Sequence, residues 1–141
     1  MSLSHFTFSG TTYEQGLAHG EALKESIIKN IEIYVNRFEN EAGISKNELL
    51  ENSGIYLNIL REQSPEYVNG MNGIAESSNL ELLEIAMLNL RYELLYHALG
   101  KKLQSDAIDG CTSFAVLPKA TENNHLLVGQ NWDWIPDVEC M

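Results

Sequence analysis

One of the chain's two cysteines, Cys111, follows an Asp109–Gly110 pair and begins a strand-like run in which alternate residues share one face. A thiol is strongly nucleophilic near neutral pH, and an N-terminal cysteine has its own α-amine, of pKa about 7.7–8.0, as a neighbouring base. Reaching that state requires cleavage of the preceding bond, and glycine lacks the Cβ that would hinder attack of the sulfur on its carbonyl carbon. The alternative is a small buried residue at a strand start, because free cysteine is among the most buried residue types.

A second polar cluster, Gly129-Gln-Asn-Trp-Asp-Trp134, follows the next strand-like run. Polar side chains beside large aromatic rings are costly to bury without partners, so the cluster is a candidate polar site. Asp133 is suited to hold an ammonium group such as the α-amine of a cleaved Cys111. The alternative is a turn in which Asn131 and Asp133 satisfy backbone groups while the tryptophans cap a core.

The remaining chemically active residues give weaker signals. His5, His97 and His125 lack the spacing of zinc ligands, so we expect neither a metal nor a cofactor. His19 lies between Gly16 and Gly20, and glycines on one helical face indicate close contact with another segment more than catalysis. Arg91 and Glu93 are two positions apart and cannot face each other on a helix, so we expect each to pair elsewhere, including with the segment that contains the cut.

Composition narrows the function classes. The chain of 141 residues has 20 acidic against 9 basic side chains and a formal charge of −11, which disfavours nucleic acid and anionic membranes as partners. It lacks the roughly 18-residue apolar run of a membrane helix and a basic-then-apolar leader, so we expect a cytoplasmic protein. Two cysteines without a CxxC pair indicate neither a disulfide framework nor redox chemistry.

Hydrophobic periodicity predicts an α+β chain of about four helices followed by a hairpin. Residues 5–9 alternate like a short strand. Capping boxes at Thr11 or Thr12 and at Ser45 predict a long helix ending at Gly43 and a second helix ending at Ser64. Pro65 opens a third helix that ends at Asn79, and a very apolar fourth helix covers 80–99. Strands are expected at 111–117 and 125–131. The ending "NWDWIPDVECM" is expected to interrupt a longer fold.

Five stretches in order resemble the acyl-coenzyme A:6-aminopenicillanic acid acyltransferase family, peptidase family C45, among the N-terminal-nucleophile hydrolases. They are "GLAHG" from Gly16, "PEYVNGMNGIAESSNL" from Pro65, "LNLRYE" from Leu88, "DGCTS" from Asp109 and "LLVGQNWDW" from Leu126. The resemblance implies an αββα sandwich made as a precursor that cuts itself between Gly110 and Cys111. Residues 1–110 would be the helical α-chain or pro-region, and 111–141 the incomplete start of the catalytic β-chain.

The resemblance also implies roles. Cys111 would be nucleophile and base, passing an acyl group from an amide or a thioester such as acyl-coenzyme A to an amine or water. Asp133 would be the acid near the amine, and further site-lining positions would be Asp109, Thr112, Gln130, Asn131 and Trp132. Bile-salt hydrolases and penicillin V acylases have an arginine where this chain has Gln130, which fits the present family better.

Other functions remain open. One is an acid-ceramidase-like or bile-salt-type amidase, and another is a non-catalytic helical interaction module whose hairpin extends a partner's sheet. The family's oxyanion-hole asparagine lies downstream of position 141, so we expect these residues alone to be inactive and to need the rest of the β-chain as partner. Exposed apolar faces and strand edges would favour a homo-oligomer.

Overall fold

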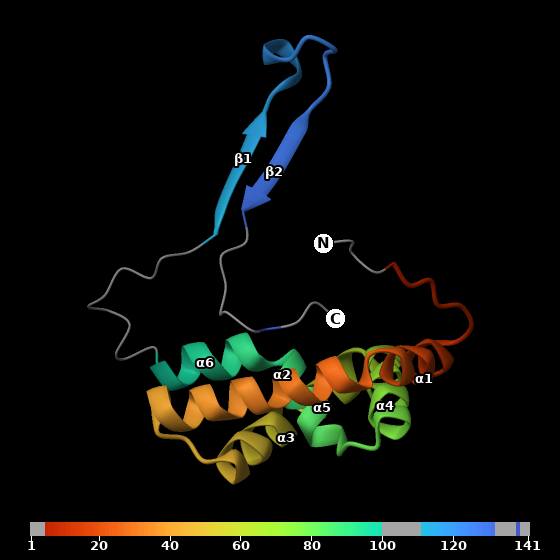
Figure 1. Cartoon of the computed structure of the whole chain (residues 1–141), viewed down its shortest axis with the longest axis vertical. Helices are drawn as coiled ribbons and strands as arrows, with labels where there is room; N and C mark the ends of the chain where they lie inside the picture. Colours follow the sequence, from red (N-terminus) through yellow and green to blue (C-terminus); the bar gives the residue numbers. More distant parts are fainter. Residues whose placement is uncertain (1–4, 100–110, 132–137, 139–141) are drawn as a thin grey trace. The chain divides into compact units, whose positions relative to one another are not determined.

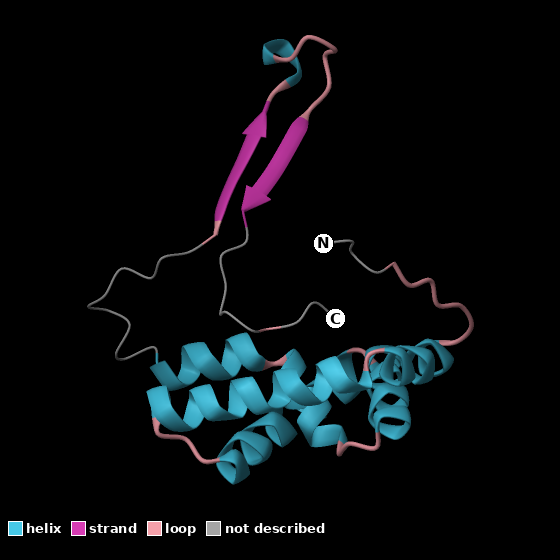
Figure 2. Cartoon of the chain, viewed as in Figure 1, coloured by secondary structure: helices cyan, strands magenta, loops and turns pink. Residues whose placement is uncertain are grey.

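A computed structural model describes residues 5–99, 111–131 and 138, which fall in two compact units. Six α-helices make up the first unit, and two antiparallel strands make up the second (Figures 1 and 2). The α+β composition and the order of helices before hairpin agree with the sequence prediction, whereas the number of helices is larger than predicted.

The first predicted helix is two helices. Thr11 caps α1 (Thr12–Ala22), and its capping box with Glu14 is formed in both directions. Leu23, with φ −122° and ψ 18°, leaves helical geometry before α2 (Lys24–Arg37) begins. The prediction of one continuous helix was therefore wrong, because neither glycine nor proline marks the break. A π-helical turn over Phe38–Ala42 follows, and Gly43 ends it at φ 70° as expected.

The predicted strand over residues 5–9 does not form. Among the described residues, the ladder pairs residues 112–116 with 127–131 and does not include this segment. Its aromatic residues instead stack: the Phe6 and Phe8 rings lie 6.1 Å apart, and Phe8 lies 5.8 Å from the His19 ring on α1. The alternating pattern therefore reflects one aromatic face that packs on a helix.

The next two helices follow the prediction. Ser45 caps α3 (Lys46–Gln63) by accepting from the Glu48 amide, and Leu49, Ser53 and Leu57 are its buried residues. Pro65 opens α4 (Pro65–Ser78), which Asn79 ends in the left-handed region at φ 58°. One half of the capping box predicted at Ser45 is formed, and Pro65 at the first position and Asn79 at the end mark the bounds of α4 without a side-chain cap at Ser64.

The most apolar stretch is again two helices, α5 (Leu82–Asn89) and α6 (Arg91–Leu99), so the prediction of a single helix was wrong. Leu90 separates them at φ −96° and ψ 10°. The adjacent side chains use the carbonyls of the last turn, because Asn89 donates to the Ile85 carbonyl and Arg91 donates to the Leu88 carbonyl. Such side-chain bonds compete with the helical ladder at this point.

Glycines allow α1 and α4 to pack with their backbones almost touching. A Cβ placed on Gly16 would lie 2.1 Å from the Gly70 carbonyl oxygen, and one on Gly73 would lie 2.2 Å from the Tyr13 carbonyl oxygen. A Cβ on Gly20 would lie 2.6 Å from the Ile74 carbonyl oxygen. The predicted close contact of Gly16 and Gly20 is thus confirmed, and it fixes the position of His19 between them.

The helical core is built from one face of each neighbouring helix. Its buried apolar residues include Ile27, Ile31, Tyr34 and Phe38 from α2 and its π-turn, Leu49 and Leu57 from α3, Val68, Met71 and Ala75 from α4, and Ile85 to Leu88 from α5. Asn30, Ser53 and Ser78 are the buried polar residues. Among the described residues, every buried side-chain polar atom has a hydrogen-bond partner.

The second unit is a two-stranded hairpin of β1 (Thr112–Val116) and β2 (Leu127–Asn131), joined through a 3₁₀ turn at Pro118–Ala120. The register pairs Thr112 with Asn131 at one end and Val116 with Leu127 at the other. Both predicted strands are present, slightly shorter than expected.

Candidate functional site

Cys111 is the residue immediately before β1, and it is exposed. This exposure contradicts the simpler explanation of the sequence, in which the cysteine is a small buried residue at a strand start. Thr112, the first residue of β1, is exposed as well. In the described part of the chain, Cys111 therefore lies at the open end of the hairpin and is exposed.

The strand register brings residues of the two predicted polar stretches together. Thr112 lies opposite Asn131, and Ser113 lies opposite Gln130. Both Gln130 and Asn131 are exposed. Asp109, Gly110, Trp132 and Asp133 lie outside the described residues. At the open end of the hairpin, Thr112, which follows Cys111, therefore lies beside the polar end of β2.

Gly129 and Phe114 fix this register. The two residues are paired across the strands, and a Cβ on Gly129 would lie 2.4 Å from the end of the Phe114 ring. The ring thus lies across β2 at the position where no side chain projects, a packing that compensates for a glycine in a strand. Because a one-residue slip would turn every side chain to the other face, this contact holds Asn131 opposite Thr112.

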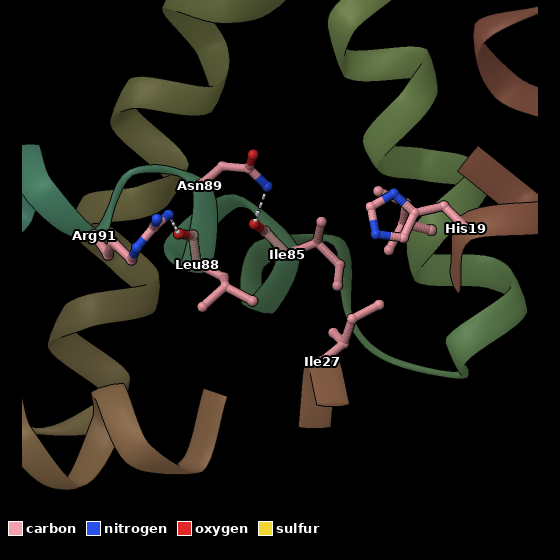
Figure 3. Close-up of a pocket in the computed structure, with 7 residues that line it drawn as sticks. His19, Ile27, Ile85, Leu88, Asn89 and Arg91 are labelled. Atoms are coloured by element: carbon pink, nitrogen blue, oxygen red, sulfur yellow. Dashed lines mark hydrogen bonds between the residues drawn. The ribbon is translucent and has the colours of Figure 1, made fainter. Parts of the chain in front are cut away.

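The helical unit contains a separate cavity of about 90 Å³ with a mostly aliphatic wall. Figure 3 shows Arg91 and His19 on opposite sides of it, with Ile27, Ile85 and Leu88 between them. A more open cavity of about 340 Å³ adjoins it, since His19, Ile74 and Asn89 line both.

Polar side chains frame these cavities. The Arg91 guanidinium is half-buried, donates to the Tyr34 hydroxyl and the Leu88 carbonyl, and lies over the Tyr34 and Tyr92 rings. Arg91 thus pairs away from Glu93, as expected. The Asn89 side chain accepts from the Tyr67 hydroxyl at 2.8 Å.

His19 is half-buried beneath Phe8, and burial lowers the pKa of its imidazole below the ordinary 6.5. The ring is therefore neutral at physiological pH. Neither ring nitrogen has a hydrogen-bond partner among the described residues, although the ring lines both cavities. A neutral imidazole with hydrogen-bonding capacity thus faces an apolar space.

Comparison with known proteins relates the chain to curated proteins, one of which is an acyltransferase. The chain is 32% identical over 131 residues to a protein named acyl-coenzyme A:6-aminopenicillanic-acid-acyltransferase 40 kDa form from Emericella nidulans. The match covers 92% of this chain. The chain is homologous to the acyl-coenzyme A:6-aminopenicillanic acid acyltransferase family. The five sequence motifs resemble this same family, which is peptidase family C45 among the N-terminal-nucleophile hydrolases. The resemblance is therefore confirmed.

The homology has a defined extent. The chain spans 34% of the length of the Emericella acyltransferase. No family model matches the chain. Within the described residues, no helix is long and apolar enough to cross a membrane, and no group of three or more His, Cys, Asp or Glu side chains is arranged to hold a metal ion.

Sequence analysis did not predict the aliphatic cavity between His19 and Arg91 of this chain. The available signal was the presence of the polar residues Asn89 and Arg91 within a very apolar stretch of the sequence. What it lacked was the break at Leu90 and the approach of α1 to α4, which bring His19 to the same cavity as residues some 70 positions away.

Proposed function

We propose that this chain is the N-terminal portion of a self-cleaving cysteine acyltransferase or amidohydrolase that works through an acyl-enzyme on Cys111. The observation that carries the proposal is the exposed Cys111 directly before β1, in a chain homologous to acyltransferases. Residues 1–110 would then form the α-chain or pro-region, and 111–141 the start of a β-chain. The hairpin would be the first two strands of an αββα sandwich.

The first step is cleavage of the bond between Gly110 and Cys111. The Cys111 sulfur attacks the Gly110 carbonyl carbon, so that a C–S bond forms, the C–N bond breaks, and the departing nitrogen takes the thiol proton. Water then hydrolyses the thioester, which leaves a Gly110 carboxylate and an N-terminal Cys111 with its thiol restored. Glycine on the acyl side favours the first attack because no Cβ shields the carbonyl.

The second step is acyl transfer. The new α-amine of Cys111 accepts the thiol proton, and the thiolate attacks the carbonyl of an amide or thioester donor. The leaving amine or thiol takes that proton, and an amine acceptor or water then removes the acyl group from sulfur. Acyl-coenzyme A is one donor of this class.

Asp133 is proposed to hold the protonated amine during the reaction. Chain geometry supports this pairing: Thr112 and Asn131 are opposite, Cys111 adjoins the first, and Asp133 is two residues beyond the second. Asp109, Gln130 and Trp132 would complete the lining with Thr112 and Asn131.

The oxyanion donors are proposed to come from residues beyond position 141, given the share of the Emericella protein that the chain spans. Loss of one such donor costs a protease about 10²–10³ in rate. We therefore expect activity from the protein made from the complete coding sequence that contains this chain, and none from these 141 residues by themselves.

The test uses that complete protein and the chain's two cysteines. After brief exposure to an acyl-coenzyme A or an N-acyl amide, intact mass should show one added acyl group on the fragment that begins with Cys111. The matched variant Cys140→Ala should behave like wild type, whereas Cys111→Ala should acquire no acyl group. Preference for the amide over the thioester would favour a bile-salt or ceramidase-type amidase.

Full activity of Cys111→Ala, or an acyl group on another residue, would contradict the proposal. Unchanged partner binding in that variant, with no thiol reactivity above that of ordinary cysteine, would favour the non-catalytic interaction module.

A further inference from the structure

The aliphatic cavity of the helical unit has polar groups at its two ends and apolar residues between them. Arg91 stands at one end and His19 at the other, and Ile27, Ile85 and Leu88 form the wall (Figure 3). Sites of this composition orient a ligand through a few polar groups while an apolar wall covers the rest of it. The arrangement does not involve Cys111.

The charge of Arg91 identifies the kind of ligand. Its hydrogen bonds go to a hydroxyl and a backbone carbonyl, both neutral acceptors, and no carboxylate of the described residues forms an ion pair with it. A half-buried guanidinium gains most from a carboxylate, which matches its planar donors. Tyr34 and Tyr92 hold the guanidinium in place through their rings, which reduces the cost of ordering it for a ligand.

The second charged group near the cavities limits where an anion can lie. Glu66 lines the larger cavity, and it already accepts a hydrogen bond from Thr12. An anionic head is therefore repelled from that side and favoured at Arg91. The uncharged lining that the two cavities share, around His19 and Ile74, suits a hydrocarbon tail.

We propose that this cavity binds a carboxylate that bears a short hydrocarbon chain, with the carboxylate at Arg91 and the chain along the aliphatic wall toward His19. The smaller cavity, about 90 Å³, has the volume of about three water molecules, so it takes the head and the first carbons. Further carbons enter the adjoining cavity beneath Phe8 and against Met71. The site goes beyond the proposed acyl transfer and does not depend on it.

Binding is measured with sodium hexanoate at neutral pH, using the Cys111→Ala protein so that acyl chemistry cannot contribute. In protein with labelled isoleucine methyl groups, hexanoate should shift the signals of Ile27 and Ile85 and leave those of the exposed Ile55 and Ile59 unchanged. Hexanamide, which has the same shape without the charge, should bind at least tenfold more weakly by calorimetry. Acetate, which lacks the chain, should also bind at least tenfold more weakly.

Two arginine variants separate charge at the site from charge elsewhere. Arg91→Gln should weaken hexanoate binding at least tenfold and leave hexanamide binding unchanged. The matched control Arg61→Gln removes an exposed arginine of α3 and should bind hexanoate like the parent protein. If Arg91→Gln does not fold by circular dichroism, Arg91→Lys and the hexanoate–hexanamide comparison on the parent protein decide the matter.

Equal affinity for hexanoate and hexanamide, or methyl shifts absent at Ile27 and Ile85, would overturn the proposal. Neither result would bear on cleavage at Cys111, because the parent protein in these measurements lacks the thiol. Conversely, failure of the acyl-enzyme test would leave hexanoate binding as expected.

Discussion

Replacement of Gly16 by alanine tests the helix contact that positions the cavity. The added Cβ would lie 2.1 Å from the Gly70 carbonyl oxygen and 3.2 Å from its Cα, and both are backbone atoms that no side-chain rotation can move. The helices α1 and α4 must therefore separate by about 1 Å or more, with loss of contacts along their length.

The expected size follows from two opposing effects. Overpacking a tight contact costs about 1–3 kcal/mol, and a clash with backbone puts Gly16→Ala at the upper end of that range. Alanine recovers about 1 kcal/mol through its better helix propensity. The net expectation is a loss of about 2 kcal/mol in the free energy of unfolding.

Gly54→Ala is the matched control. Gly54 is also within a helix, but a Cβ there would meet only the Leu83 side chain, at an ordinary 3.6 Å. This substitution should stabilise the protein by about 0.5–1 kcal/mol, because only the propensity term applies. Urea unfolding followed by circular dichroism at 222 nm compares the two. If Gly16→Ala were as stable as Gly54→Ala, the close approach of α1 and α4 would be refuted.

Three further results are expected. Burial lowers the pKa of His19 in the folded protein, so the unfolded chain binds its proton more readily; stability should fall as pH drops below about 6.5, and urea midpoints of His19→Gln should show a smaller fall between pH 7 and 5. Thr11→Ala removes the hydrogen bond that the Thr11 hydroxyl accepts from the Glu14 amide and keeps the backbone half of the capping box; it should lower the free energy of unfolding by about 1 kcal/mol in urea titrations, whereas an unchanged midpoint would show that the side-chain cap contributes nothing. Gly129→Val would collide with the Phe114 ring, and cross-strand amide contacts measured by NMR should be lost; a hairpin with all its contacts intact would contradict the packing described.

Local chemistry determined how well the sequence predicted the fold. The start of α1 at Thr11, the start of α3 at Ser45 and the end of α4 at Asn79 were all predicted, because each signal lies within a few residues of the boundary it sets. The hairpin was predicted from its period of two. The breaks at Leu23 and Leu90 were missed, since leucine favours helices and tertiary packing decides where they end.

Residues 5–9 show the opposite failure. Their alternation satisfies the pattern of a strand, but a strand also needs a partner, and Phe8 instead stacks on His19. The pattern records which face is apolar, and it does not record what covers that face. For this reason the same five residues fit a strand by sequence and an aromatic cover for α1 by structure.

The two candidate sites differ in the same way. Cys111 and the polar end of β2 were proposed as a site from sequence because thiols and clustered polar residues are visible there, and the register places Thr112 opposite Asn131. The cavity between Arg91 and His19 was not found, because it depends on how α1, α4 and α5 meet. The spacing of Gly16 and Gly20 predicted that α1 contacts another segment, but it did not identify α4 as that segment.

Identification of the new N-terminus tests the central claim most directly. The protein made from the complete coding sequence is purified, its fragments are separated, and the first residues of each are read by terminal sequencing. Self-cleavage predicts one fragment that begins Cys-Thr-Ser-Phe at Cys111, present in Cys140→Ala and absent from Cys111→Ala. A chain that stays whole in active wild-type protein, or a cut at another bond that Cys111→Ala does not prevent, would contradict the account.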